Sequence, residues 1–243
     1  MTMPPIRVIT FDLDDTLWDV RPVLIEAERR MQLWLKEHAP AARALLADGG
    51  AQTIRNALLA DQPALAHQIS RLRITVLQSA MRQAGHTPAR ADQLAQRAFA
   101  VFLAARNEIT VFDGVAALLR SLAQHYRLGA LSNGNADLRR LDVGEHFDFH
   151  FSAENVGAAK PDPALFHAAL QHAQVSPDEV LHVGDSVEHD VAGAARAGIR
   201  SVWINPHGLP LPAASPPPTA QVRTVLELPG VLQQLHDHSF KHS

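Results

Sequence analysis

The apolar residues of this chain recur with two different periods, and the periods divide it into two kinds of region. Short apolar runs typical of buried strands begin with a β-branched run at Ile6 and return throughout the second half. The expected strands cover residues 6–11, 126–131, 147–151, 180–183 and 201–204. Residues 22–106 instead place apolar residues at helical spacing. Leu65, Ile69 and Leu72 form one such series.

The alternation of strands and helices in the second half predicts a parallel sheet covered on both faces, an α/β fold with a three-layer core. Expected helices cover residues 113–124, 162–173 and 187–197. The first strand belongs to the same sheet, although the all-helical segment separates it from the other strands. We therefore expect a core formed by residues 1–18 and 109–243, with residues 19–108 inserted as a helical cap domain.

Three carboxylates follow the first expected strand within four positions: Asp12, Asp14 and Asp15. A buried strand does not tolerate several unpaired charges, so these acids are expected where the strand leaves the carboxyl edge of the sheet. Clustered carboxylate oxygens suit a hard divalent cation such as Mg²⁺. The alternative interpretation is a polar turn, because Asp is common after strands.

A second polar segment, Ser132-Asn133-Gly134, follows the strand expected at residues 126–131. A hydroxyl group and successive backbone N–H groups at such a turn can bind phosphate oxygens. An ordinary turn is the alternative here as well.

Lys160 is unusual because only three of the 22 lysines and arginines are lysines. Its compact ammonium can approach a phosphate or a carboxylate as a point charge. Pro161 restricts the backbone of Lys160 to extended conformations and so helps to fix its direction. A plain surface lysine is the alternative interpretation.

Asp185 repeats the pattern of Asp12, because an apolar strand delivers it to the sheet edge directly after Gly184. We expect it to be a metal ligand, although it could instead cap the next helix. Asp190, five residues further on, could support the metal or its waters.

The composition is that of an ordinary globular protein, with 47% apolar and 19% charged residues. The chain contains no cysteine, no long apolar run and no signal-peptide pattern, so we expect a cytoplasmic protein that does not bind membranes. A net charge of −3 argues against nucleic-acid binding. Residues 19–108 nevertheless hold 12 basic and 8 acidic residues, which suits an anionic ligand or reflects chance on solvated helices.

The polar segments occur in the order Asp-x-Asp-x-Thr, Ser-Asn-Gly, Lys-Pro and Gly-Asp-x₄-Asp, each at the carboxyl end of an expected strand or in a loop beside it. In this order they resemble the four motifs of the haloacid dehalogenase-like hydrolase superfamily. The resemblance covers the whole chain, including a helical insertion after the first motif. It implies a Rossmann-like core with a helical cap.

The resemblance also implies a Mg²⁺-dependent phosphatase that acts on a small-molecule phosphate ester. Asp12 would be the nucleophile that forms an aspartyl-phosphate, and Asp14 would be the general acid and then the general base. The Asp12 side chain, the Asp14 backbone carbonyl and the Asp185 side chain would hold the metal, with Asp190 close by.

The resemblance assigns the phosphoryl oxygens to Ser132 and Lys160, with Thr16 and Asn133 completing the binding site. The acid at position 14 favours phosphoryl transfer over dehalogenation, because a halide leaves without a proton.

A narrower resemblance rests on FDLDDTLWDVRP, residues 11–22, and SNGNADL, residues 132–138. These segments are similar to bacterial phosphatases that act on FMN and on the phosphorylated pyrimidine precursor of riboflavin. The cap would then choose among leaving groups, and Arg21 and Arg73 are its candidate contacts. A salt-bridged surface arginine is the alternative for each. We expect a monomer or a homodimer.

Other functions share parts of this pattern. A phosphomutase would use the same residues and needs a cap group that returns the phosphoryl group to the substrate. A phospho-acceptor signalling module also uses an Asp cluster, Ser or Thr and Lys on a parallel sheet. Such modules are about half as long and carry no large cap. A catalytically silent binding protein is disfavoured, because each motif retains its catalytic residue.

Overall fold

The computed structural model describes residues 4–240, which separate into two compact units. The sheet unit contains the residues up to Asp19 together with those from Thr110 onward. The helical unit is Val20–Ile109, and it is inserted between the first strand and the rest of the sheet unit.

The sheet unit is built on a six-stranded sheet with the order β3-β2-β1-β4-β5-β6. The strand pairs are all parallel within the described residues. The strands are β1 (Val8–Phe11), β2 (Arg127–Ser132), β3 (Phe149–Ser152), β4 (Val180–Gly184), β5 (Arg200–Ile204) and β6 (Ala220–Val222). This architecture confirms the predicted α/β class with a Rossmann-like parallel sheet.

Strand β1 lies in the interior of the sheet, and its four residues are all buried. It pairs with β2 on one side and with β4 on the other, so Thr10 lies opposite Gly129 and His182. The ladder extends to Asp12, whose N–H donates to the Val183 carbonyl at 2.8 Å. The carboxyl ends of β2, β1 and β4 are therefore adjacent, and the polar residues that follow them are brought together.

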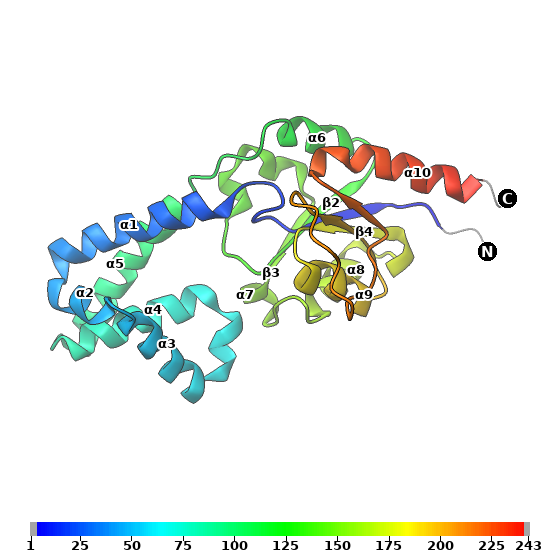
Figure 1. Cartoon of the computed structure of the whole chain (residues 1–243). Helices are drawn as coiled ribbons and strands as arrows, with labels where there is room; N and C mark the ends of the chain where they lie inside the picture. Colours follow the sequence, from blue (N-terminus) through cyan, green and yellow to red (C-terminus); the bar gives the residue numbers. More distant parts are fainter. Residues whose placement is uncertain (1–3, 241–243) are drawn as a thin grey trace. The chain divides into compact units, whose positions relative to one another are not determined.

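Helices cover both faces of this sheet, with α6 and α10 on one side and α8 and α9 on the other (Figure 1). Their bounds, with that of the short α7, are α6 (Val115–Leu122), α7 (Ala153–Val156), α8 (Ala164–Ala173), α9 (Ala192–Arg196) and α10 (Leu228–Phe240). Leu165, Phe166 and Ala169 of α8 pack against buried residues of the strands. This apolar burial is the main stabilisation of the layer.

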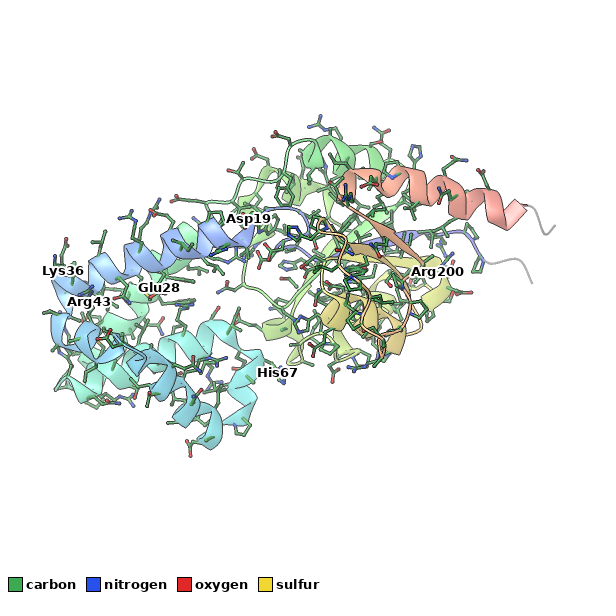
Figure 2. All side chains as sticks on the ribbon, viewed as in Figure 1. Asp19, Glu28, Lys36, Arg43, His67 and Arg200 are labelled. Carbon is green, nitrogen blue, oxygen red and sulfur yellow. The ribbon has the colours of Figure 1, made fainter. Side chains whose placement is uncertain are left out.

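The helical unit has its own apolar core, which includes Ala27, Met31 and Leu72. Its elements are α1 (Val20–His38), α2 (Pro40–Leu46), α3 (Gly50–Asp61), a 3₁₀ turn (Pro63–His67), α4 (Ile69–Gln83) and α5 (Pro88–Arg106). Charged side chains such as Glu28 and Lys36 stand on its surface (Figure 2). Among the helices of residues 4–240, none combines the length and the apolar character needed to cross a bilayer.

Three local features differ from the sequence-based expectation. Strand β6 was not expected, because it has only three residues, follows a proline-rich segment and pairs with β5 alone within the described sheet. The helix expected over 187–197 begins as a π-helical turn, Val187–Val191, before α9. Helix α10 is longer than the apolar residues around Val231 indicated, because a Thr224–Glu227 capping box begins the turn that leads into it.

Gly129 provides a test of the strand packing. A Cβ built there would lie 2.2 Å from the Phe149 ring, which is buried and packed beside Phe151 and His172. We expect Gly129→Ala to lower the free energy of unfolding by about 1–3 kcal/mol, the usual cost of overpacking. Urea unfolding followed by circular dichroism measures the change.

Gly230→Ala is the matched control, because nothing lies within 4 Å of a Cβ at Gly230. It should not lower the free energy of unfolding. Equal stability of the two alanine variants would contradict the packing described around Phe149.

Candidate active site

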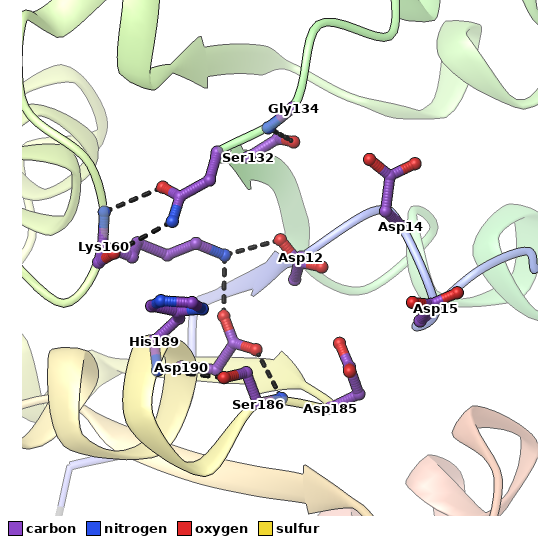
Figure 3. Close-up of a pocket in the computed structure, with 11 residues that line it drawn as sticks. Asp12, Asp14, Asp15, Ser132, Gly134, Lys160, Asp185, Ser186, His189 and Asp190 are labelled. Carbon is purple, nitrogen blue, oxygen red and sulfur yellow. Dashed lines mark hydrogen bonds and ion pairs between the residues drawn. The ribbon is translucent and has the colours of Figure 1, made fainter. Parts of the chain in front are cut away.

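The polar residues at the carboxyl edge of β1, β2 and β4 line a cavity of about 170 Å³. Figure 3 shows how the four sequence segments converge on it. The lining residues are Asp12, Asp14, Asp15, Ser132, Asn133, Gly134, Lys160, Asp185, Ser186, His189 and Asp190. Each predicted motif therefore contributes to one pocket of the sheet unit.

Lys160 occupies the centre of this arrangement. Its ammonium donates to Asp12 Oδ1 and to Asp190 Oδ1, at 2.6 Å in both cases, and its side chain is 1% exposed. Burial opposes its charge, but the two carboxylates outweigh burial and raise the pKa of Lys160 above its ordinary value. The surface-lysine alternative is therefore wrong for the described structure.

Asn133 fixes the backbone from which the Lys160 side chain extends. Its side-chain oxygen accepts from the Lys160 N–H at 2.8 Å, and its side-chain amide donates to the Lys160 carbonyl at 2.9 Å. The loop after β2 thereby holds the segment that carries the lysine. The peptide bond between Lys160 and Pro161 is cis.

The Asp190 carboxylate accepts three hydrogen bonds in the pocket. Its Oδ1 accepts from Lys160 and from His182 Nε2, and its Oδ2 accepts from the Ser186 N–H at 2.9 Å. Burial alone would raise its pKa, but Lys160 and His182 reverse the direction and hold the pKa of Asp190 below its usual range. Asp190 is thus the ionised partner that keeps Lys160 charged and in place.

His182 lies on β4 with 0% exposure, between Thr10 and Asp190. Burial lowers the pKa of His182 against the opposing effect of Asp190, which favours the neutral ring. A carboxylate can only accept a hydrogen bond, so the Nε2–H donates to Asp190 at 3.1 Å. The Nδ1 atom then accepts from the Thr10 hydroxyl at 2.9 Å.

Asp12 and Asp185 differ from Asp190, because fewer hydrogen bonds offset the cost of burying their charge. Burial raises the pKa of Asp12 to about 8 despite the opposing effect of Lys160. Burial, together with the charge of Asp190, raises the pKa of Asp185 to about 6. Three acids thus lie near one ammonium, which contacts Asp12 and Asp190, and a bound cation would favour the charged forms of Asp12 and Asp185.

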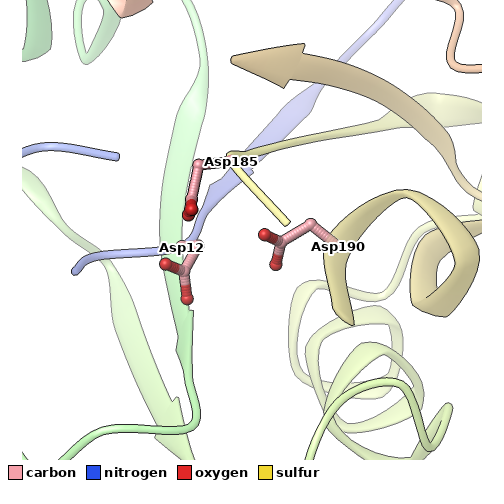
Figure 4. A group of neighbouring side chains, drawn as sticks. All are labelled: Asp12, Asp185 and Asp190. Atoms are coloured by element: carbon pink, nitrogen blue, oxygen red, sulfur yellow. The ribbon is translucent and has the colours of Figure 1, made fainter. Parts of the chain in front are cut away.

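The donor set fits Mg²⁺. Carboxylate oxygens of Asp12, Asp185 and Asp190 lie within 4.8 Å of one another (Figure 4), and hard oxygen ligands are those that this ion prefers. Asp190 has three hydrogen bonds already, whereas Asp12 accepts from Lys160 through Oδ1 and Asp185 accepts from Thr16 through Oδ1. The Asp12 and Asp185 side chains are therefore the better ligands.

Two residues predicted to bind phosphate have different surroundings. Ser132 lines the pocket, and its Oγ accepts from the Gly134 N–H at 2.9 Å. Its hydroxyl proton therefore does not point toward Gly134. Thr16 is buried, and its hydroxyl donates to Asp185 Oδ1 at 3.2 Å. Thr16 therefore orients Asp185, and its direct role in binding phosphate stays a prediction.

Asp14 lines the pocket beyond Asp12, and its carboxylate points away from Asp185 (Figure 3). Arg21 and Arg73 belong to the helical unit. Arg73 donates to Glu28 at 2.8 Å and lies 3.9 Å from the centre of the Phe102 ring. Within the helical unit, Arg73 therefore forms a salt bridge with Glu28, as the alternative interpretation expected.

The sequence-based interpretation missed three residues around the pocket. His182 could have been noticed as a polar residue within an otherwise apolar strand, directly opposite Thr10. His189 lines the pocket on the turn after Asp185 without a comparable signal. Trp203 donates from its indole to the Asp185 carbonyl at 2.8 Å, a contact that no local sequence pattern indicates.

The chain belongs to the haloacid dehalogenase-like hydrolases, whose family pattern matches residues 6–198. It is 34% identical to the Escherichia coli K12 5-amino-6-(5-phospho-D-ribitylamino)uracil phosphatase YigB over 83% of this chain and 84% of that protein. It is 36% identical to a Thermus thermophilus phosphoserine phosphatase over 58% of each chain. These relatives confirm the expected enzyme class, a hydrolase of phosphoric monoesters.

A solved structure described as a 2-haloacid dehalogenase from Pseudomonas syringae pv. Tomato DC3000 is also similar. The sequences are 41% identical, the TM-score is 0.91, and the match covers 94% of this chain and 99% of the other. This structure supports the same fold and family as the sequence relatives do. The reactions named differ, because YigB is called a phosphatase and the solved structure a dehalogenase.

The buried histidine yields a prediction about stability. His182→Leu should lower the free energy of unfolding by about 1–3 kcal/mol, because the Thr10 hydroxyl and Asp190 each lose a buried partner. Urea unfolding measures the effect. His125→Leu, at an exposed position, is the control and should stay within about 0.5 kcal/mol of the parent. Similar small changes in both variants would contradict the buried hydrogen bonds.

Proposed function

We propose that the protein is a Mg²⁺-dependent phosphatase that hydrolyses a small-molecule phosphate monoester through an aspartyl-phosphate on Asp12. The observation that carries this proposal is the position of Asp12 at the edge of the pocket. Its carboxylate is held by Lys160 and lies within 4.8 Å of the other acids that suit a cation. The residues proposed as nucleophile, cation ligands and phosphate-binding groups all line this one pocket, which supports the proposal.

The cation would be held by the side chains of Asp12 and Asp185 and by the Asp14 backbone carbonyl. When bound, it would offset the repulsion between an anionic nucleophile and an anionic phosphate. Thr16 and Trp203 hold Asp185 by its carboxylate and its carbonyl, which keeps that ligand in one orientation.

In the first step, an Asp12 oxygen forms a bond to phosphorus while the bond from phosphorus to the leaving oxygen breaks. The electron pair of the broken bond stays on the leaving oxygen, which takes a proton from Asp14. Lys160 and Ser132 bind the phosphoryl oxygens as their charge shifts. The alcohol leaves with its new proton.

In the second step, a water molecule attacks phosphorus and gives a proton to the Asp14 carboxylate. The bond between phosphorus and Asp12 breaks, and its electron pair returns to Asp12. Inorganic phosphate leaves, and Asp14 is protonated again for the next turnover. The net reaction consumes one water and one ester.

For the substrate, the similarity to YigB supports 5-amino-6-(5-phospho-D-ribitylamino)uracil, and FMN is the related candidate. The match spans 201 residues, more than the sheet unit contains, so it extends into the helical unit. We propose that the helical unit acts as the cap that selects the leaving group.

Dehalogenation is the second candidate, because of the similarity to the structure described as a 2-haloacid dehalogenase. Asp14 argues against it, since departure of a halide needs no proton donor. Phosphate release and halide release should be measured with Mg²⁺ on a panel containing the ribitylaminouracil phosphate, FMN, sugar phosphates and 2-chloropropionate. Halide release without phosphate release from any ester would overturn the proposal.

Replacing the nucleophile gives a direct prediction. Asp12→Asn keeps the shape of the side chain, so the fold should persist while kcat falls by roughly 10³-fold or more, as for other covalent nucleophiles. Steady-state kinetics on an aryl phosphate measure the loss. The parent enzyme should lose activity in EDTA and regain it with Mg²⁺. Full activity of Asp12→Asn, or of the parent in metal-free buffer, would contradict the site.

The arginines of the helical unit give a prediction about specificity. Arg21→Ala or Arg73→Ala should raise KM for the preferred substrate several-fold and spare a small aryl phosphate, because only uniform binding is lost. Glu28→Gln is a control for Arg73, since it removes the ion pair and keeps the arginine. If neither arginine variant separates the two substrates, these residues have no part in specificity.

A further inference from the structure

The chain folds back on itself immediately after the nucleophile. Asp15 has a φ of 60°, a left-handed conformation that Asp adopts more readily than most residues. Its N–H donates to the Trp18 carbonyl at 2.7 Å, and the Leu17 N–H donates to the Leu13 carbonyl at 2.9 Å. Asp14 and Trp18 therefore lie side by side, joined by an isolated β-bridge.

The indole of Trp18 uses this turn to reach the Asp14 carboxylate. Its Nε1–H donates to Asp14 Oδ1 at 2.7 Å, and the Trp18 residue is 0% exposed. The neighbouring Leu17 is tied to another part of the sheet unit, because its carbonyl accepts from the Phe112 N–H at 2.9 Å. A large buried ring on an anchored backbone has little freedom, so the direction of its N–H is fixed.

We propose that Trp18 is a positioning residue that determines which oxygen of Asp14 carries the transferable proton. The proposal rests on the proposed function, in which Asp14 gives a proton to the leaving oxygen. An indole N–H can donate but cannot accept, and the unprotonated oxygen of a carboxyl group is the stronger acceptor, so the N–H favours that oxygen. Because Trp18 donates to Oδ1, this contact favours Oδ2 as the oxygen that carries the transferable proton of Asp14.

The same contact serves both steps of the reaction. When Oδ2 gives up its proton to the leaving oxygen, the hydrogen bond from Trp18 becomes charge-assisted and therefore stronger. When water later returns a proton to Oδ2, the indole still occupies Oδ1. Trp18 thus holds one carboxylate orientation through both proton transfers without itself gaining or losing a proton.

A leaving-group comparison tests this role. Trp18→Phe keeps the aromatic bulk and removes the N–H. For an alkyl phosphate, whose alkoxide needs a proton to leave, kcat/KM should fall by roughly tenfold or more, part of the usual contribution of general acid catalysis. For 4-nitrophenyl phosphate, whose leaving group needs no proton, kcat/KM should stay within about twofold of the parent. Its kcat should still fall, because activation of water belongs to the second step.

Trp203→Phe is the matched control, since it also removes a buried indole N–H, one that binds the backbone of Asp185. Any loss in this variant should be the same for the two esters. The proposal would be overturned if Trp18→Phe lowered kcat/KM equally for the two esters. It would also be overturned if kcat/KM for the alkyl ester did not fall. A double-mutant cycle gives a further check. If Trp18→Phe lowered kcat/KM for the alkyl ester as much in the Asp14→Asn enzyme as in the parent, the two residues would act independently and the proposal would be overturned.

The contact can also be tested without activity. The chain has three tryptophans, so a ¹⁵N-labelled sample should give three indole N–H resonances that Trp→Phe variants assign. Asp14→Ala should shift the Trp18 resonance and leave that of Trp34 in place. An unmoved Trp18 resonance would overturn the inference. Absence of phosphate release from every ester would instead overturn the proposed function, so the two failures are distinguishable.

Discussion

The buried ion pair between Lys160 and Asp12, shared with Asp190, is the interaction on which the rest of the site depends. One ammonium lies 2.6 Å from both carboxylates, and the side chains of Lys160 and Asp190 are almost fully buried. Removing Lys160 would leave buried carboxylates uncompensated, which is strongly destabilising. Removing the charge of Asp12 alone leaves Lys160 paired with Asp190. The surrounding structure therefore supports this pair from several elements, including the Asn133 loop and His182 on β4.

The parallel sheet makes this concentration of charge possible. Because β1 lies between β2 and β4, its carboxyl end is flanked by Ser132, the last residue of β2, and by Asp185, the residue directly after β4. Parallel strands point all their carboxyl ends to one edge, so polar groups meet there while the strand interiors stay apolar. The charge left over from three acids and one lysine then makes the edge suitable for a cation and an anionic ester together.

Much of this arrangement could be predicted from sequence, because it follows local rules. Short apolar runs revealed β1, β2 and β4, and a carboxylate or hydroxyl directly after each run indicated the edge. Partners distant in sequence could not be predicted in the same way. The bonds from His182 to Asp190 and from Trp203 to Asp185 depend on strand register and helix geometry, which local periodicity does not contain. The π-helical turn that carries Asp190 likewise reads as an ordinary helix in the sequence.

The central claim, a covalent phosphoryl intermediate on Asp12, can be tested by trapping that intermediate in the unmodified enzyme. The enzyme is mixed with an aryl phosphate and Mg²⁺, quenched in acid during turnover, reduced with borohydride and digested for mass spectrometry. Reduction converts an aspartyl-phosphate to homoserine. If Asp12 is the nucleophile, we expect homoserine at position 12 and unmodified Asp14 and Asp185. Homoserine at another position, or no homoserine at any position during turnover, would contradict a covalent intermediate on Asp12.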